Sequence, residues 1–181
     1  GGVSAEDERG IGGVERVMGP NGQAQYKVAN ISEAYTVLFE IYRHTYCDPR
    51  TGQVPRFQSN DVPNRDICLH PYTDSNHPHF NTIGDIFAPT LNAERKKPFA
   101  IRHVMQALID QDSPQLERFS NLHQGESAVI WSAHIGGISS MVIGIESQPI
   151  LRRGRVPLDG PDTWTGGTLF PQSSKKIARA I

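Results

Sequence analysis

Hydrophobic side chains recur with helical spacing in two parts of the chain. After Asn30 they fall at positions 34, 37, 38, 41 and 42, the spacing of one helix face. Asn30 followed by Glu33 resembles a helix N-cap, so the pattern predicts a helix over about 32–46. A second stripe predicts an amphipathic helix that is opened by Pro98. Its members are Ile101, Val104, Met105, Leu108 and Ile109.

Two runs rich in β-forming residues, 127–135 and 138–147, are joined by Gly136-Gly137. Both glycines can take positive φ, so the pattern predicts an antiparallel hairpin with a two-residue turn. Alternation along the first run places Val129, Trp131 and Ile135 on one face.

Two further elements are predicted near the ends of the chain. Asn21-Gly22 lies between "ERVM" and "QAQYKVA" and predicts a turn that joins a pair of strands. The closing "SSKKIARAI" predicts a helix that Ser173 or Ser174 caps. Its buried side is expected to carry Ile177, Ala178 and Ile181.

Residues 47–98 differ from the rest of the chain in composition and in hydrophobic pattern. They hold seven of the thirteen prolines and lack helical periodicity. Proline fixes φ and removes a hydrogen-bond donor, so we expect little regular structure and no helix or strand longer than about eight residues within 52–80. The segment is interpreted as a linker between two folded parts, 1–46 and 99–181.

Composition narrows the class of protein. The 181 residues suffice for a domain with a core, and 18 basic against 19 acidic residues provide no field that would attract nucleic acid. No apolar stretch approaches the ~18 residues of a membrane span, and the first residues do not resemble a signal peptide. Cys47 and Cys68 form no CxxC motif, which fits a reducing cytoplasm. The bare start and the abrupt end suggest a segment of a longer chain.

The stretch "HPYTDSNHPHF" is the first candidate for chemistry. It contains His70, Asp74, His77 and His79, which are residue types that bind zinc. However, prolines interrupt it, and neither an HExxH nor a CxxC motif accompanies it. We therefore expect an exposed, proline-stiffened loop without a metal.

The remaining candidates are a glycine turn and two arginines. Gly166-Gly167-Thr168 precedes the last predicted helix, where free backbone amides can bind an anion or a developing oxyanion. Arg102 lies beside the apolar stripe of its helix, either at the rim of a cleft or on an ordinary solvated face. Arg65 is the second arginine of interest. No GxGxxG motif, P-loop, Ser-His-Asp or Cys-His arrangement has local support.

Four stretches together resemble a known family. "GGVERVMGPNGQAQYKVANISEA", "KKPFAIRHVMQALIDQD", "HIGGISSMVIGIES" and "DGPDTWTGGTLFPQSSKKIARAI" occur in the order seen in the carboxyltransferase domain of biotin-dependent acyl-CoA carboxylases. The resemblance is to acetyl-CoA carboxylases and the large fused bacterial type, and it covers nearly the whole chain. "DVPNRDI", with Arg65, stands where the family has a DPxDR-like motif.

The resemblance implies an α/β fold of two tandem crotonase-like (ClpP/crotonase) subdomains. Residues 1–46 would end the first subdomain, 47–98 would link the two, and 99–181 would open the second. It also implies a cytoplasmic enzyme of fatty acid biosynthesis that is homo-oligomeric, such as a dimer. Its partners would be a biotin carboxyl carrier domain and a biotin carboxylase domain.

The same resemblance implies the reaction. A carboxyl group moves from carboxybiotin to the α-carbon of an acyl-CoA, with acetyl-CoA giving malonyl-CoA. The enolate would be stabilised by backbone amides without a side-chain acid, and the reaction would need no Ser, Cys or His nucleophile and no metal. The family's main oxyanion turns are expected to lie outside this segment, so we expect it to hold no catalytic residue and to be inactive alone. Substrate binding would fall to Arg102, Gly166, Gly167, Thr168 and Arg65. The alternative is a non-catalytic interaction module, or a degenerate subunit, that keeps only the middle of the fold.

Overall fold

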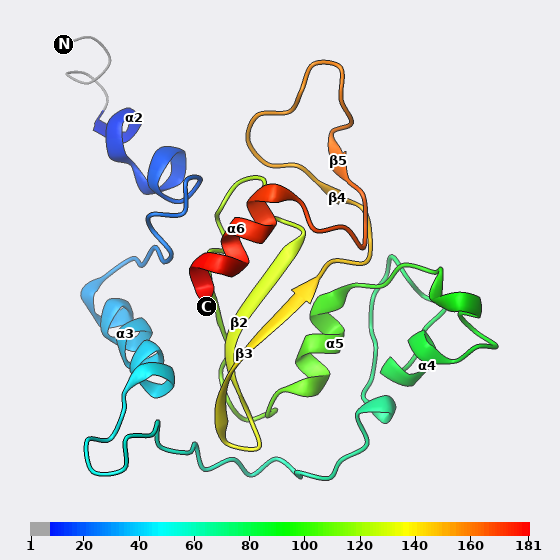
Figure 1. Ribbon diagram of the computed structural model, residues 1–181, viewed down its shortest axis with the longest axis horizontal. Helices are drawn as coiled ribbons and strands as arrows, with labels where there is room; N and C mark the ends of the chain where they lie inside the picture. The colour runs from blue at the N-terminus through cyan, green and yellow to red at the C-terminus, as the bar shows by residue number, and fades with distance from the viewer. Residues whose placement is uncertain (1–7) are drawn as a thin grey trace.

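The computed structural model describes residues 8–181 and shows a mixed α/β arrangement built around one β-hairpin (Figure 1). Strands β2 (Ala128–Ile135) and β3 (Ile138–Ile145) pair antiparallel, and Ile135 faces Ile138 across the turn. The two-residue β1 (Leu116–Glu117) pairs with the other edge of β2, which gives the order β1-β2-β3. The predicted hairpin is confirmed.

A second, smaller sheet lies beyond the hairpin. It pairs β4 (Ile150–Leu151) with β5 (Thr163–Trp164) in antiparallel register. The chain then passes through the 166–168 turn into the last helix, α6 (Pro171–Ala180).

The hairpin turn has the backbone that its glycines allow. Gly136 and Gly137 take φ values of 57° and 75°, the left-handed region that two-residue hairpins require. The carboxylate of Asp110 accepts a hydrogen bond from each of their amides, both at 2.7 Å. On the predicted face Val129 and Trp131 are buried, but Ile135 is 42 % exposed because the packed cluster ends at Ala133.

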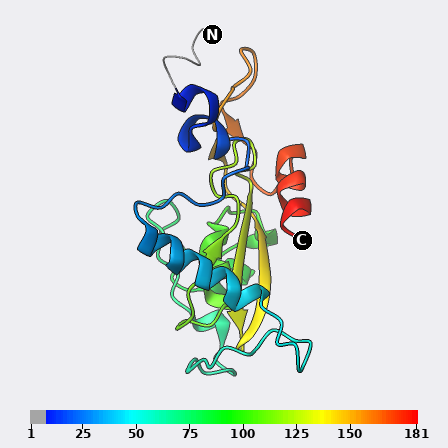
Figure 2. The same ribbon diagram turned by 90° about the vertical axis from the view of Figure 1, so that its left-hand side faces the viewer.

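Helices cover both faces of the hairpin (Figures 1 and 2). On one face lies α5 (Ile101–Leu108). Its Met105, together with Ile109 just after the helix, packs against Val129, Trp131 and Ala133 of β2. On the other face, Ile130 packs with Ala180 of α6 and with Phe119 and Leu122. Alternate residues of β2 therefore belong to two separate cores. The predicted amphipathic helix is confirmed, although it starts three residues after Pro98.

The helix expected over 32–46 is present as α3 (Ile31–Thr45). The side chain of Asn30 accepts a hydrogen bond from the amide of Glu33 at 3.0 Å, so the predicted cap is confirmed. The helix ends beside the hairpin, where His44 stacks on His134 with ring centroids 4.4 Å apart. Figure 2 shows α3 running alongside the hairpin.

The predicted strand pair around Asn21-Gly22 is wrong. The segment before it forms α2 (Glu8–Gly12) and a π-helical turn (Val14–Met18), closed by the hydrogen bond from Gly19 N to Val14 O at 2.7 Å. The predicted turn itself is nevertheless present. Gly22 has a φ of 77°, and the side chain of Asn21 accepts a hydrogen bond from the amide of Gln23 at 2.9 Å. Such a turn is local and does not require paired strands on either side of it.

The start and the buried side of α6 also differ from expectation. The helix begins at Pro171, whose fixed φ suits the first helical turn, so Ser173 and Ser174 lie inside it rather than at its cap. Its buried side carries Ser173, Lys176, Ile177 and Ala180, whereas Ala178 is exposed and Ile181 is 87 % exposed. The predicted buried set was therefore right only at Ile177.

Residues 47–98 contain only short elements: a 3-10 turn (Ile67–Leu69), α4 (Ile83–Phe87) and a second 3-10 turn (Ala93–Arg95). The expectation for 52–80 is confirmed. The expectation that the histidine stretch is exposed holds only in part. His79 is exposed, but His77 is buried, and Tyr72 and Phe80 are buried with residues of α4 and α5. A segment without periodicity can still bury single aromatic side chains.

Two further findings concern the described residues. Cys47 and Cys68 are free and exposed. Among residues 8–181, no helix combines the length and the apolar character that a membrane span needs.

Candidate functional site

A cavity of about 500 Å³ lies between α5, α6 and the start of β2. Its charged lining comes from six parts of the chain: Arg102, Glu117, Glu126, Glu146, Arg153 and Lys176. Three cations and three carboxylates in one cavity require close pairing, because an unpaired charge away from water is costly. The hydrogen bonds around them show how that pairing is achieved.

Arg102 and Glu117 form a bidentate ion pair. The two guanidinium nitrogens donate to the two carboxylate oxygens at 2.5 and 2.8 Å. Burial opposes ionisation of Glu117, yet the Arg102 guanidinium holds its pKa below the usual value. The hydrogen bond to Glu117 likewise raises the pKa of Arg102. The Arg102 side chain remains 48 % exposed, so one side of the pair faces solvent.

The second pair joins Arg153 to Glu126. Arg153 Nε donates to the carboxylate at 3.1 Å, and Trp164 Nε1 donates to its other oxygen at 2.7 Å. The Trp164 ring in turn packs under the guanidinium of Arg152, 3.9 Å from the ring centroid. These contacts anchor the small β4–β5 sheet to one wall of the cavity.

Glu146 connects three elements. Its Oε1 accepts from the amides of Ile101 at 3.1 Å and Ser147 at 3.0 Å, which places a carboxylate at the N-terminus of α5. Its backbone carbonyl accepts from the amide of Gly167 at 2.7 Å. The helix of Arg102 and the glycine turn are thus held to the same residue at the end of β3.

Lys176 is the most buried charged side chain of the cavity, with 2 % exposure. Its Nζ donates to the carbonyls of Ala128 at 2.6 Å and Gly125 at 3.3 Å, and across residues 8–181 it forms no salt bridge. Burial lowers its pKa to about 8, against the opposing field of Glu117. The lysine therefore ties α6 to the start of β2 while carrying a charge that the interior disfavours.

The structure places Arg102 in this cavity, but not the glycine turn. Gly166, Gly167 and Thr168 lie against the strand end at Glu146–Gln148, outside the cavity lining. The approach is close, because a Cβ on Gly166 would lie 2.2 Å from Ser147 O. The amide of Gly167 is occupied by Glu146, so the expectation of free amides holds only for Gly166 and Thr168, which have no acceptor among residues 8–181.

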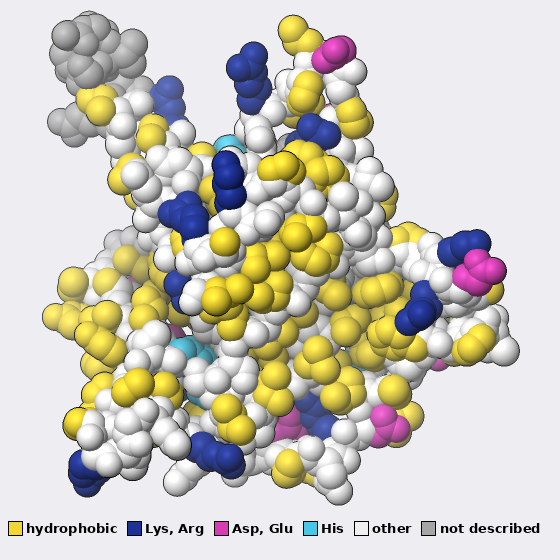
Figure 3. Space-filling model, viewed as in Figure 1, with side chains coloured by type: hydrophobic (Ala, Val, Ile, Leu, Met, Phe, Trp, Pro, Cys, Tyr) yellow, Lys and Arg dark blue, Asp and Glu magenta, His cyan; other side chains and the backbone are white. Residues whose placement is uncertain are grey.

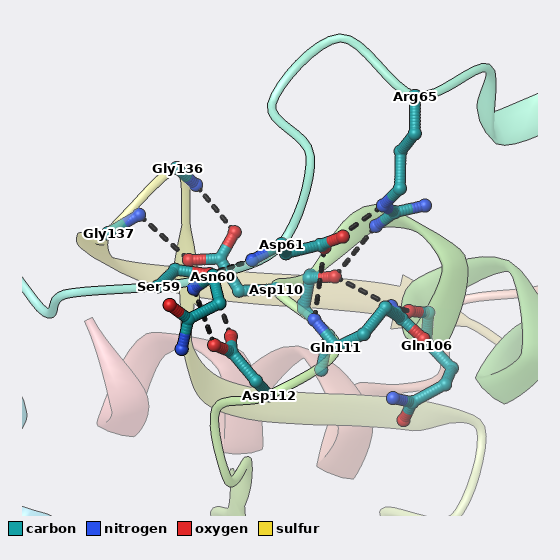
Figure 4. A network of polar contacts seen from close by, with 11 residues as sticks. Ser59, Asn60, Asp61, Arg65, Gln106, Asp110, Gln111, Asp112, Gly136 and Gly137 are labelled. Atoms are coloured by element: carbon teal, nitrogen blue, oxygen red, sulfur yellow. Dashed lines mark hydrogen bonds and ion pairs between the residues drawn. The ribbon is translucent and has the colours of Figure 1, made fainter.

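Arg65 lies in a different network, at the other end of α5 (Figure 4). Its Nη2 donates to the carbonyl of Ile109 at 2.8 Å and its Nε to Asp61 at 3.0 Å. The same Asp61 oxygen accepts from the amide of Gln111 at 3.1 Å. Arg65 therefore fastens the 59–65 segment to the end of α5 and does not line the cavity with Arg102.

The histidines of the 70–80 stretch contact neighbouring side chains. His77 Nε2 lies 2.8 Å from Oε1 of Gln148, and the His77 and His79 rings stand 6.0 Å apart. In the part of the chain from residue 8 onward, no group of three histidine, cysteine or acidic side chains gathers closely enough to hold a metal ion.

Sequence reasoning missed most of the charged lining. The sequence pattern indicated only strands, loops or a solvent-exposed helix face for four of these residues: Glu117, Glu126, Glu146 and Lys176. One signal was available for Lys176: it shares the i, i+3, i+4, i+7 spacing of Ser173, Ile177 and Ala180. The carboxylates gave no comparable signal, because their partners are far away in sequence.

The class of protein follows from comparison with protein families: the family described as the carboxyl transferase domain matches residues 2–181. The chain belongs to this family, the carboxyltransferase domain of biotin-dependent carboxylases. No individual curated protein matches the chain significantly.

Proposed function

We propose that this chain is part of the carboxyltransferase of an acyl-CoA carboxylase. In the proposed reaction carboxybiotin supplies a carboxyl group to the α-carbon of an acyl-CoA, and acetyl-CoA gives malonyl-CoA. The observation that carries the proposal is the family match over residues 2–181, which includes every segment around the charged cavity.

The proposed carboxyl transfer requires that the negative charge of an enolate intermediate be stabilised. Removal of the α-proton gives an enolate whose charge gathers on the thioester oxygen, and preorganised amides stabilise such an oxygen without an acidic side chain. The amides of Gly166 and Thr168 lack acceptors among residues 8–181, which supports a donor role for them. Gly167 would have a positioning role instead, because its amide binds Glu146 O at 2.7 Å.

In the proposed reaction Arg102 would bind a carboxylate group of the substrate or product. A guanidinium offers two parallel donors that match carboxylate geometry, as its pairing with Glu117 already demonstrates. Because the side chain is 48 % exposed, a second carboxylate can approach without disrupting the pair. In this proposal Glu117 holds the guanidinium in place and Lys176 fixes α6 behind it.

The proposal extends to the architecture. Residues 1–46 would end one crotonase-like subdomain, 47–98 would cross between subdomains, and 99–181 would open the second. The layered α5–hairpin–α6 arrangement supports the last assignment. A biotin carboxyl carrier domain, a biotin carboxylase domain and a homo-oligomeric assembly in the cytoplasm complete the proposal, while Arg65 serves the linker rather than the substrate.

The test is malonyl-CoA decarboxylation and biotin carboxylation by the full-length protein. We expect Arg102→Gln to lower kcat/KM for malonyl-CoA by about tenfold to a hundredfold, the effect of losing a charged hydrogen bond worth roughly 1.5–3 kcal/mol. The double variant Arg102→Gln/Glu117→Gln is the control, because it removes the carboxylate that the single variant leaves unpaired. Recovery of activity in the double variant would show that Arg102 acts only by neutralising Glu117.

One observation favours the second candidate, an interaction module. Helix α3 has no fully buried residue and exposes large aromatic side chains, with Tyr35, Phe39 and Tyr42 between 52 and 61 % exposed. Exposed apolar stripes of this kind are typical of binding surfaces. A wild-type protein that folds and shows neither decarboxylation nor biotin carboxylation would favour this function over the first.

A further inference from the structure

The peptide group between Glu146 and Ser147 connects the glycine turn to the helix that carries Arg102. Glu146 directly follows β3 and is buried, with 6 % exposure. Figure 3 shows mainly hydrophobic and uncharged side chains over the end of β3 and the start of α5. Across residues 8–181 the Glu146 carboxylate forms no salt bridge, and its hydrogen-bond donors are two backbone amides. Such donors are needed, because an uncompensated charge away from water is costly.

One trans peptide group carries two of the polar atoms in this connection. Its N–H, on Ser147, donates to Oε1 of Glu146 at 3.0 Å, and its carbonyl, on Glu146, accepts from the amide of Gly167 at 2.7 Å. The described residues contain no cis peptide bond, and a trans peptide group is planar with its N–H and C=O pointing in opposite directions. When the carboxylate fixes the N–H, it therefore also fixes the direction in which the carbonyl meets the glycine turn.

The same carboxylate oxygen holds the start of α5. Oε1 of Glu146 also accepts from the amide of Ile101 at 3.1 Å, and Ile101 directly precedes Arg102. Amides in the first turn of a helix have no acceptor within the helix, so a carboxylate there satisfies a donor and interacts favourably with the helix dipole. Oε2 of Glu146 has no hydrogen-bond partner among residues 8–181, so both contacts pass through one oxygen.

Close packing leaves the glycine turn little freedom to move independently. A Cβ on Gly166 would lie 2.2 Å from the carbonyl oxygen of Ser147 and 2.9 Å from the carbonyl carbon of Gln148. The turn therefore rests directly on the backbone that follows Glu146. Because a close-packed contact transmits a displacement, rotation of the 146–147 peptide group would shift the turn with it.

We propose that Glu146 is a positioning residue for carboxyl transfer, whose side chain orients the glycine turn and the start of α5 together. The amides of Gly166 and Thr168 and the guanidinium of Arg102 would then keep a fixed separation. That arrangement suits a substrate with a thioester oxygen at one end and a carboxylate at the other. This inference rests on the proposed function, and in it Glu146 touches no reacting atom. Positioning of this kind matters because a misplacement of about 1 Å can lower a rate about a hundredfold.

The first experiment is hydrogen–deuterium exchange of the full-length protein, resolved to single amides by mass spectrometry. Glu146→Ala removes the acceptor of the Ile101 amide but leaves the carbonyl that accepts from Gly167. A purely local role would therefore speed exchange at Ile101 alone. Coupling through the peptide group should speed exchange at both amides, by at least about tenfold at Ile101, which loses a charged acceptor.

Two references accompany this variant. Glu146→Gln keeps a carbonyl oxygen that can accept from both amides, so exchange should stay within about threefold of the wild type. Helix α3 is the internal reference, and its exchange should be unchanged in every variant. Glu146→Asp takes the place of Glu146→Ala if the latter does not fold. It keeps the charge but is one methylene too short to hold both amides, so exchange should again rise at both.

The second experiment is malonyl-CoA decarboxylation by the same variants. Misplaced donors act mainly on the transition state, so Glu146→Ala should lower kcat by at least about tenfold with a smaller change in KM. Glu146→Gln should restore kcat to within about threefold of the wild type, because it restores the positions of both elements.

Three results would overturn the coupling. Faster exchange at Ile101 alone would mean that the side chain only caps α5. Faster exchange in α3 as well would mean that the whole structure is destabilised. A loss of kcat in Glu146→Gln as large as in Glu146→Ala would mean that a carboxylate oxygen contacts the substrate directly. Failure of the proposed function is distinguishable: a wild type without turnover, with exchange as expected, would refute carboxyl transfer and leave the coupling in place.

Discussion

Lys176 offers the sharpest test of the physical reasoning about the cavity. Its side chain is 2 % exposed, and its two hydrogen bonds go to carbonyls rather than to a carboxylate. Replacement by methionine keeps the length of the side chain and removes the charge. We expect the free energy of unfolding near neutral pH to fall by no more than about 3 kcal/mol, because two opposite effects partly cancel.

The magnitudes follow from the contacts. Two hydrogen bonds from a charged donor are each worth roughly 1.5–3 kcal/mol, and methionine leaves their carbonyl acceptors unsatisfied. Against this, burial lowers the pKa of Lys176 from 10.5 to about 8. That difference corresponds to roughly 3 kcal/mol by which the interior disfavours the ammonium form.

The pH dependence separates the two effects. In the unfolded chain the lysine keeps its proton up to about pH 10.5, whereas the folded protein releases it near pH 8. Between these values the unfolded state binds more protons, so the stability of the wild type should rise with pH. Lys176→Met should lack this rise. Below about pH 8 both states are protonated, and the difference between the two proteins should be constant.

The assay is urea unfolding of wild type and Lys176→Met between about pH 7 and about pH 10, read as midpoint and slope. Lys175→Met, at the exposed neighbour, is the matched control and should follow the wild type. Parallel pH profiles for wild type and Lys176→Met would refute the reasoning. They would mean that Lys176 titrates like an exposed lysine and that its contacts with the two carbonyls do not persist in solution.

Two further predictions concern the hairpin and the histidine stack. Gly137→Ala should lower the free energy of unfolding by at least about 1 kcal/mol more than Gly52→Ala in urea titrations, since both glycines have positive φ but only a Cβ on Gly137 would lie 2.3 Å from Phe57 O; equal losses would contradict the close approach. Burial lowers the pKa of His44 from 6.5 to about 4, so its contribution to stability is present above pH 6.5 and lost as the pH falls toward 4. His44→Phe should therefore show a flatter loss of stability over that range, and an unchanged acid profile would contradict the pKa.

Local elements were predictable where the signal is itself local. The cap of α3 needs only Asn30 and Glu33, and the hairpin turn needs only two glycines between β-forming runs, so both predictions held. The family resemblance rested on four stretches in order and was confirmed over residues 2–181. The strand pair at Asn21-Gly22 failed because a local turn signal does not determine what its flanking segments contact.

The charged cavity depended on tertiary structure. Arg102 was identified from its helix, but its partner Glu117 is fifteen residues away on another element, and Glu146 reaches the amide of Ile101 from the end of β3. Periodicity reports which face of an element is apolar; it carries no information about which distant polar groups meet there. Arg65 and Arg102 looked alike in sequence, yet they lie at opposite ends of α5, and only the packing of the 59–65 segment against the end of α5 decides that difference.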